Sequence, residues 1–232
     1  MAATRLMTVS LVEAISEDIR SAIMRGEYPP DASFTETSVA EQYDVARPTA
    51  KAAIEKLVAE ALLERRTNKT ARVIKLGPED VRDIYLTRAR LEKSVLLELA
   101  ATRSVPEAAI AAQRDLERLE GGSGFDTVDP DMRFHMSLVE SIGSPRTSRM
   151  YGSLVSQVKL CMAQIQGLEL VDPKRIIKEH QHLIELIQAG DGLAASSFLD
   201  EHLSRPRERL VAAVGGTPGP EADRDSSLDR AS

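Results

Sequence analysis

Apolar residues recur every three or four positions along most of this chain, which is the spacing typical of amphipathic helices. Residues 9–25 show the pattern first, and Gly26 ends that segment. The sequence EYPPDAS that follows predicts a turn, because paired prolines cannot continue a helix. The positions that share the apolar face of the first segment are Val9, Val12, Ile15, Ile19, Ala22 and Ile23.

Four further short elements follow in the N-terminal third. Helical patterns cover residues 35–44 and 46–62, and Pro48 is tolerated in the first turn of the second, where no N–H is needed. Residues 62–66 and 70–76 then form two short runs that predict a β-hairpin. Three helices followed by a hairpin are the element order of a winged helix-turn-helix domain, which we place at residues 9–76. The alternative is a small helical domain with a basic surface.

The remainder of the chain predicts an all-helical bundle over residues 77–214, so the fold class is mainly α. Stretches rich in Gly, Pro, Ser and Asp separate its predicted helices. Residues 215–232 have the same bias without apolar periodicity, and we expect a disordered tail there. The predicted helices of the bundle cover residues 81–103, 106–119, 128–142, 145–166, 173–189 and 192–213.

Composition narrows the class of protein. With 42% hydrophobic residues the chain can bury a substantial core, and with only 3% aromatics it favours helices. A single cysteine, Cys161, excludes an internal disulfide framework and suits a reducing compartment. No apolar run approaches the ~20 residues of a membrane span, and the N-terminus lacks the apolar core of a signal peptide. We therefore expect a cytoplasmic protein without a membrane partner.

Charge is distributed unevenly along the chain. The formal net charge is −6, yet residues 45–76 hold eight basic and three acidic side chains, a net charge of +5. The rest of the chain therefore carries −11. A small basic segment attached to an acidic body suits a protein that contacts nucleic-acid phosphates with one face only.

The four histidines all lie in the C-terminal half and supply the candidate chemistry. Asp131 and His135 are four positions apart and share one face of a predicted helix. His180 and His202 each lie on the apolar face of another predicted helix, whereas His182 points away from the face of His180. One carboxylate and three imidazoles can hold Zn²⁺, Ni²⁺, Mn²⁺ or Fe²⁺. The alternative is that each is an ordinary core or surface histidine.

The chain resembles transcription regulators of the GntR family that carry an FCD-type effector domain. The stretch IRSAIMRGEYPPDASFTETSVAEQYDVARPTAKAAIEKLVAEALLERR is similar to their winged helix-turn-helix domain. The segments VRDIYLTRARLEKSVLLELAA, DMRFHMSLVE, KEHQHLIELIQAGD and FLDEHL are similar to successive parts of the FCD domain. Together the similar segments cover about residues 10–212.

The resemblance implies roles for particular residues of the bundle. FCD domains typically hold a divalent metal through one aspartate and three histidines, and the matching positions are Asp131, His135, His180 and His202. A small carboxylate effector commonly binds in the same cavity, assisted by an arginine of the first bundle helix. Arg88 is the matching position, with Arg90 a weaker candidate. An ion pair with Glu92, one turn further on, is the alternative role for Arg88.

The DNA-reading segment departs from the family pattern at several positions. The family's Ser-Arg pair is Ala46-Arg47 here, its Thr-Pro is transposed to Pro48-Thr49, and its second arginine is Lys51. Asp44, Ala61 and Thr70 stand where the family usually has glycine. These differences put the usual operator sequence in doubt more than DNA binding itself. The residues expected to contact DNA are Thr37, Arg47, Thr49, Lys51, Arg66, Asn68 and Lys69.

Together these patterns predict a metabolite-responsive, DNA-binding transcription regulator. We expect a homodimer, because two DNA-binding domains on a two-fold axis can read a palindromic operator. The resemblance implies a repressor more often than an activator. A metal-sensing regulator is one alternative. A metalloenzyme is another, because this ligand set can activate a nucleophile. Against the enzyme, the sequence shows no additional inward acid or base that is clearly placed for proton transfer, and the basic segment would have no role.

Overall fold

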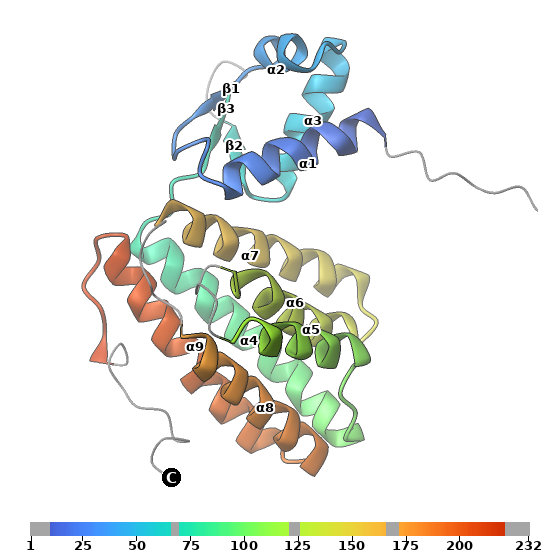
Figure 1. The fold of residues 1–232 in the computed structure, drawn as a ribbon, viewed down its shortest axis with the longest axis vertical. Helices are drawn as coiled ribbons and strands as arrows, with labels where there is room; N and C mark the ends of the chain where they lie inside the picture. Colours follow the sequence, from blue (N-terminus) through green and yellow to red (C-terminus); the bar gives the residue numbers. More distant parts are fainter. Residues whose placement is uncertain (1–9, 66–69, 121–125, 166–171, 221–232) are drawn as a thin grey trace, which may run out of the picture. The chain divides into compact units, whose positions relative to one another are not determined.

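A computed structural model gives the structure of residues 10–65, 70–120, 126–165 and 172–220. Within these ranges the chain divides into two compact units, with the boundary between Lys75 and Leu76. The fold is mainly α, as the sequence predicts: three helices and three short strands form the N-terminal unit, and six helices form the second, which we call the helical unit (Figure 1).

The N-terminal unit is a winged helix-turn-helix domain. Its two-residue strand β1 was not predicted, because two residues are too few to show a pattern. The sheet has the order β1-β3-β2, and both pairings are antiparallel, with Leu63 opposite Val73 and Phe34 opposite Ala71. The helices pack around fully buried Ile19, Ile54 and Leu57. The elements in chain order are α1 (Leu11–Met24), β1 (Ser33–Phe34), α2 (Glu36–Tyr43), α3 (Arg47–Ala59), β2 (Leu63–Arg65) and β3 (Ala71–Val73).

A side-chain cap fixes the start of α2, whereas α3 begins without one. Thr35 caps α2, because its hydroxyl accepts from the N–H of Ser38 and the Ser38 hydroxyl accepts from the N–H of Thr35. Ala46 occupies the N-cap of α3 and makes no side-chain cap, because its methyl group cannot accept a hydrogen bond. The turn between the helices contains Asp44 in the left-handed region, with φ 49° and ψ 52°.

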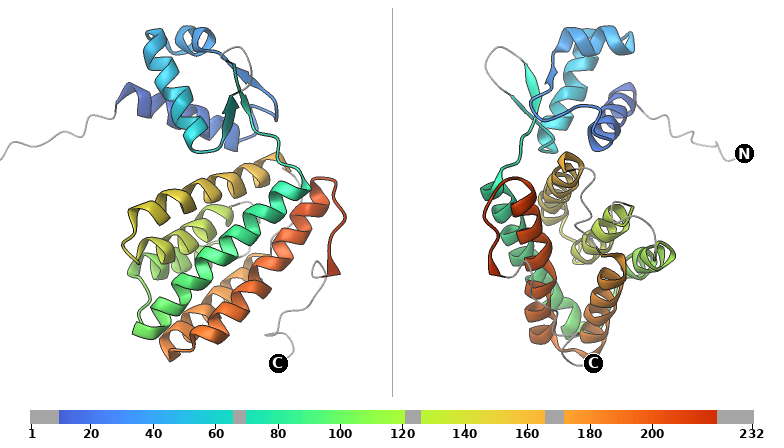
Figure 2. Two further views of the ribbon diagram at one scale, coloured as in Figure 1. Left: turned by 180° about the vertical axis from the view of Figure 1, so that it is seen from behind. Right: turned by 60° about the vertical axis from the view of Figure 1, so that its left-hand side comes forward.

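The helical unit is a bundle in which α4 (Pro78–Thr102) contacts four other helices, α6, α7, α8 and α9 (Figures 1 and 2). The helix α4 begins one turn earlier than predicted, because the Asp80 carboxylate accepts from the N–H of Gly77 and fixes the first turn. The remaining helices are α5 (Glu107–Arg118), α6 (Val128–Glu140), α7 (Pro145–Gln164), α8 (Pro173–Ala189) and α9 (Gly192–Ala213).

The first residues of the expected tail make specific contacts with this bundle. The N–H of Gly219 donates to buried Glu208, and Arg82 of α4 donates to the carbonyl oxygen of Thr217. Gly216 lies so close to Pro78 that a Cβ there would approach within 2.7 Å. Residues 215–220 are therefore held against α4 and α9, and residues 221–232 lie outside the described part of the chain.

Ala61 offers a test of backbone strain in the N-terminal unit. Its φ is 56°, in a region that costs L-residues about 1–2 kcal/mol. We expect Ala61→Gly to raise the free energy of unfolding by about 1 kcal/mol, since relief of strain exceeds the added entropy of the unfolded chain. The matched control is Ala52→Gly inside α3, which should lower it by about 1 kcal/mol. Urea denaturation followed by far-UV circular dichroism gives both values, and a loss of stability in Ala61→Gly would contradict the expectation.

Candidate metal centre

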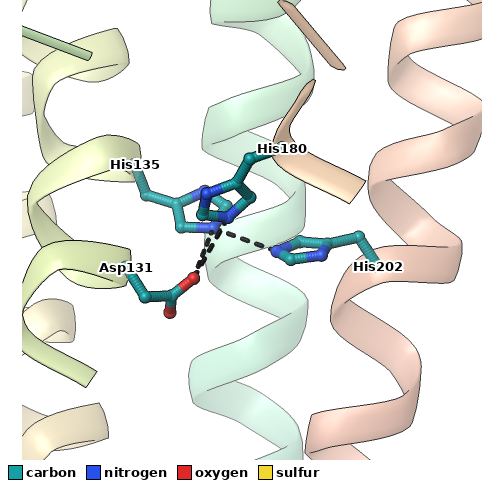
Figure 3. A group of neighbouring side chains, drawn as sticks. All are labelled: Asp131, His135, His180 and His202. Carbon is teal, nitrogen blue, oxygen red and sulfur yellow. Dashed lines mark hydrogen bonds and ion pairs between the residues drawn. The ribbon is translucent and has the colours of Figure 1, made fainter. Parts of the chain in front are cut away.

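Three helices of the helical unit bring one carboxylate and three imidazoles together. Asp131 and His135 lie one turn apart on α6, His180 lies on α8, and His202 lies on α9. Figure 3 shows all four side chains pointing toward one another in front of α4. Their nearest ligand atoms lie within 4.8 Å of one another. The grouping predicted from helical faces is therefore present in the structure.

The cluster lies inside the bundle. His135 and His180 are fully buried, and His202 is 5% exposed. Nε2 of His180 lies 3.1 Å from Oδ1 of Asp131, and Nε2 of His135 lies 3.7 Å from the same oxygen. Nε2 of His135 and Nε2 of His202 are 3.1 Å apart. These atoms converge on one small region from three directions.

Two buried glutamates determine which ring nitrogen carries the proton in His135 and in His202. Nδ1 of His135 lies 2.6 Å from Oε2 of Glu92, and Nδ1 of His202 lies 2.8 Å from Oε2 of Glu179. An ionised carboxylate can only accept, so each Nδ1 must carry the proton and donate it. In a neutral imidazole, Nε2 then presents a lone pair. When both rings are neutral, two lone pairs face each other across 3.1 Å, and a cation coordinated by both nitrogens would stabilise this contact.

The remaining polar atoms of the cluster also fit a cation. Among the described residues, both ring nitrogens of His180 and Oδ1 of Asp131 are buried without a hydrogen bond, although Nε2 of His180 and that oxygen lie 3.1 Å apart. Buried polar atoms without partners are rare in folded proteins and call for an explanation. Three imidazole nitrogens and one carboxylate oxygen, all aimed at one point, are a donor set that suits a divalent transition metal.

The ionisation states of His180 and Asp131 also suit a divalent metal ion. Burial lowers the pKa of His180 to about 4, so the ring is neutral at neutral pH and keeps a lone pair. Burial alone would raise the pKa of Asp131, but its contact with His180 and the other neighbouring imidazoles outweigh burial and hold the pKa below its ordinary value. A neutral imidazole and an ionised carboxylate are the forms that bind metal.

Arginines and a tyrosine surround the two glutamates. Glu92 accepts from Nε of Arg88 at 3.1 Å and from the Tyr151 hydroxyl at 2.5 Å. Burial opposes ionisation of Glu92, but His135 and Arg88 lower its pKa to about 2. The Arg88–Glu92 ion pair considered from the sequence is thus present.

Glu179 has a similar environment on the other side of the cluster. It accepts from Arg175 and from Arg205, both at 3.0 Å. Burial opposes its ionisation, while the contacts with His202 and Arg205 lower its pKa to about 2. The sequence shows no additional inward acid clearly placed for proton transfer, and the structure places the buried carboxylates of Glu92 and Glu179 beside the cluster. The available signal for Glu92 was its position one turn after inward-facing Arg88.

A cavity of about 70 Å³ adjoins the cluster and includes Asp131 and His202 in its wall. At about 10–15 Å³ for each water-sized group, it encloses roughly five to seven such groups, which suits a small ligand. Arg88 contributes to the wall, and its Nη2 is buried without a hydrogen-bond partner in the described residues. The other charged side chains of the wall are Asp172, Arg175, Glu179, Arg205 and Arg209.

His182 and Arg90 behave as expected for side chains outside the site. His182 is half-buried, with its ring 4.7 Å from that of Phe198, and it does not belong to the cluster. Arg90 is exposed, unlike Arg88. Helical periodicity therefore separated inward from outward positions correctly at both places.

The predicted DNA-contacting residues that the structure describes lie on α2 and α3. Arg47 and Lys51 are exposed one turn apart on α3, and Thr49 is half-buried beside them. Glu55 continues this face, where its charge would repel phosphate, but Arg65 of β2 donates to it. Thr37 is half-buried on α2. The wing residues Arg66, Asn68 and Lys69 lie outside the described residues.

A winged helix-turn-helix unit joined to a helical unit with a buried His/Asp cluster defines a class of DNA-binding regulators. Comparison with known proteins gives the family. Residues 11–73 match the bacterial regulatory proteins of the gntR family, and residues 83–205 match the FCD domain. The chain belongs to the GntR family and carries an FCD domain. It is therefore a transcription regulator and not an enzyme.

Individual relatives agree with this assignment. The HTH-type transcriptional repressor GlaR of Escherichia coli K12 is 25% identical over 211 residues, covering 85% of this chain and 94% of GlaR. A GntR regulator from Rhodococcus sp. RHA1 shares the fold with a TM-score of 0.73 at 18% identity, over 88% of this chain and 99% of that one. Escherichia coli McbR/YncC gives 0.70 at 18% identity, with the same coverage. Among the described helices, none combines the length and apolarity needed to cross a bilayer.

The metal centre is tested most simply by substitution of one histidine. We expect untagged wild-type protein to carry close to one divalent metal ion per chain after loading, and His180→Ala to lose most of it, because one of four donors is removed. The matched control is His182→Ala, two residues away on the same helix, which should bind metal as the wild type does. Elemental analysis after gel filtration gives the ratio. Equal metal in His180→Ala and wild type would remove His180 from the site.

Proposed function

We propose that this regulator is a repressor that responds to a small carboxylate metabolite, and that its FCD domain binds one divalent metal ion beside the metabolite. The observation that carries the proposal is the convergence of Asp131 and three imidazoles, two of which are held by buried glutamates. The ion would supply a Lewis-acidic centre for oxygen atoms of the metabolite. Repression is favoured by the similarity to GlaR, which is a repressor.

The charged side chains of the cavity wall favour binding of a negatively charged ligand. Four arginines and three acids contribute to its wall, so the wall has an excess of positive charge before any cation is added. Nη2 of Arg88 is buried and unpartnered in the described residues, and a carboxylate oxygen is the acceptor that a guanidinium binds most strongly. We therefore assign Arg88 to effector binding while its Nε remains bonded to Glu92.

The N-terminal unit would read DNA as one half of a homodimer. A two-fold axis brings two winged domains to two half-sites of a palindromic operator, with α3 in the major groove. Arg47 can bind guanine through two hydrogen bonds, whereas Lys51 offers a point charge to phosphate. Ligand binding would change operator affinity by favouring one arrangement of the two domains over another.

The role of Arg47 is open to direct measurement. Arg47→Ala should weaken binding to operator fragments, selected by the wild-type protein from random duplexes, by about 1–3 kcal/mol, or roughly 5- to 150-fold. The matched control is Arg25→Ala, which removes the same charge from the end of α1 and should change affinity much less. Fluorescence anisotropy at constant salt gives both values. Equal losses in the two variants would mean that Arg47 contributes only net charge.

The role of the metal is tested by its removal. Protein freed of metal with a chelator should still bind the operator but should lose its response to a panel of short carboxylates. Metal-loaded protein should show a ligand-dependent change of about 5- to 150-fold in operator affinity. If operator affinity instead follows metal content without any carboxylate, the protein is a metal sensor and the carboxylate proposal fails. An equal carboxylate response with and without metal would remove the metal from effector binding.

A further inference from the structure

Glu179 joins the metal cluster to the wall of the cavity through a single carboxylate. Its Oε2 accepts from Nδ1 of His202 at 2.8 Å. Its Oε1 accepts from Nε of Arg175 and from Nη1 of Arg205, both at 3.0 Å. Glu179 is only 3% exposed, so these charge-assisted bonds are little screened by solvent.

The same four side chains contribute to the cavity wall: Arg175, Glu179, His202 and Arg205. An anion that enters this cavity therefore meets the two guanidinium groups that Glu179 holds. Because both are bonded to the same oxygen of Glu179, the anion competes with Oε1 for their N–H groups. The opposite oxygen, Oε2, faces His202 and does not meet the anion in that competition.

Glu92, which bonds His135 on the other side of the cluster, differs from Glu179 in one respect. Glu92 accepts from Nε of Arg88, while Nη2 of the same guanidinium is buried without a hydrogen-bond partner among the described residues. An anion can thus bind Nη2 and leave the Arg88–Glu92 bond in place. The bond from Glu92 to His135 would then change little.

We propose that Glu179 is a positioning residue that couples anion binding in the cavity to the affinity of His202 for the cation. This inference rests on the proposed cation and carboxylate sites and adds how one regulates the other. When an anion draws Arg175 and Arg205 from Oε1, less of the negative charge of Glu179 is neutralised. The carboxylate then becomes a stronger acceptor for Nδ1–H of His202, and Nε2 becomes a more basic ligand. Anion and cation therefore bind with positive cooperativity, and by linkage each raises the affinity of the other equally.

The experiment measures Ni²⁺ affinity by isothermal titration calorimetry on the full chain, with and without acetate. Chloride replaces acetate to keep ionic strength constant. In the wild type, acetate should raise Ni²⁺ affinity by about fivefold or more, the lower end of usual coupling between sites. Glu179→Gln keeps the size of the side chain but removes its charge. It should weaken Ni²⁺ binding by about 10- to 100-fold and lose most of the gain from acetate.

Glu185→Gln is the matched control, since it makes the same change on α8 at a side chain that is 58% exposed and lies outside the cluster. It should keep both the wild-type Ni²⁺ affinity and the gain from acetate. Weaker Ni²⁺ binding in Glu179→Gln is expected from any supporting role, so the gain from acetate is the readout that distinguishes coupling.

The outcomes separate this inference from the proposed function. If Glu179→Gln keeps the full gain from acetate, or if the wild type binds Ni²⁺ without any gain, the coupling is overturned and the cation site stands. If the wild type binds no Ni²⁺, the proposed cation site fails, and the coupling fails with it.

A second variant covers the case in which Glu179→Gln does not fold, as judged by circular dichroism. Arg175→Gln removes one guanidinium from the cavity wall and leaves the bond between Glu179 and His202. Because less of the charge of Glu179 is then neutralised, Ni²⁺ affinity without acetate should rise above the wild-type value, and much of the gain from acetate should be lost. An unchanged gain in Arg175→Gln overturns the coupling independently.

Discussion

The convergence of three buried imidazoles and the partly buried carboxylate of Asp131 on one point is the constraint on which the helical unit depends. Taking an ionised carboxylate out of water costs several kcal/mol unless opposite charge or hydrogen bonds compensate. The side chains come from α6, α8 and α9, so these helices must pack at one depth and register for the compensation to exist. The contacts of α4 with all three helices hold them in that register. A cation at this point would link the three helices directly.

Glu92 and Glu179 lie next to the cluster and accept hydrogen bonds from two of its histidines. Each fixes the tautomer of one histidine and is itself held ionised by that histidine and by arginine, although both are buried. This arrangement places positive charge in the cavity wall and lone pairs at the cluster. The charges of the wall would suit an anion and the cluster would suit a cation, and the two glutamates contact both regions. This arrangement fits the proposed regulation by a charged metabolite.

Much of the fold could be predicted from the sequence, because the spacing of apolar residues agrees with the residues that begin and end helices. The helices α8 and α9 have the predicted bounds: Pro173 opens one, Gly190 ends it, and Asp191 caps the next. Helical faces also identified the four residues of the cluster. Periodicity cannot locate the hydrogen bonds between helices, however. Glu179 precedes His180 in the sequence, yet it bonds His202 and Arg205 on another helix, and only the tertiary structure shows this.

Asp131, His135, His180 and His202 are proposed to bind one divalent ion through three imidazoles and a carboxylate. X-ray absorption at the metal edge, on protein loaded with Ni²⁺ or Zn²⁺, tests it most directly. The account predicts nitrogen and oxygen ligands at about 2.0–2.2 Å with outer-shell scattering from three imidazole rings. A spectrum with a sulfur ligand, or with a hydrated ion that shows no imidazole scattering, would contradict it.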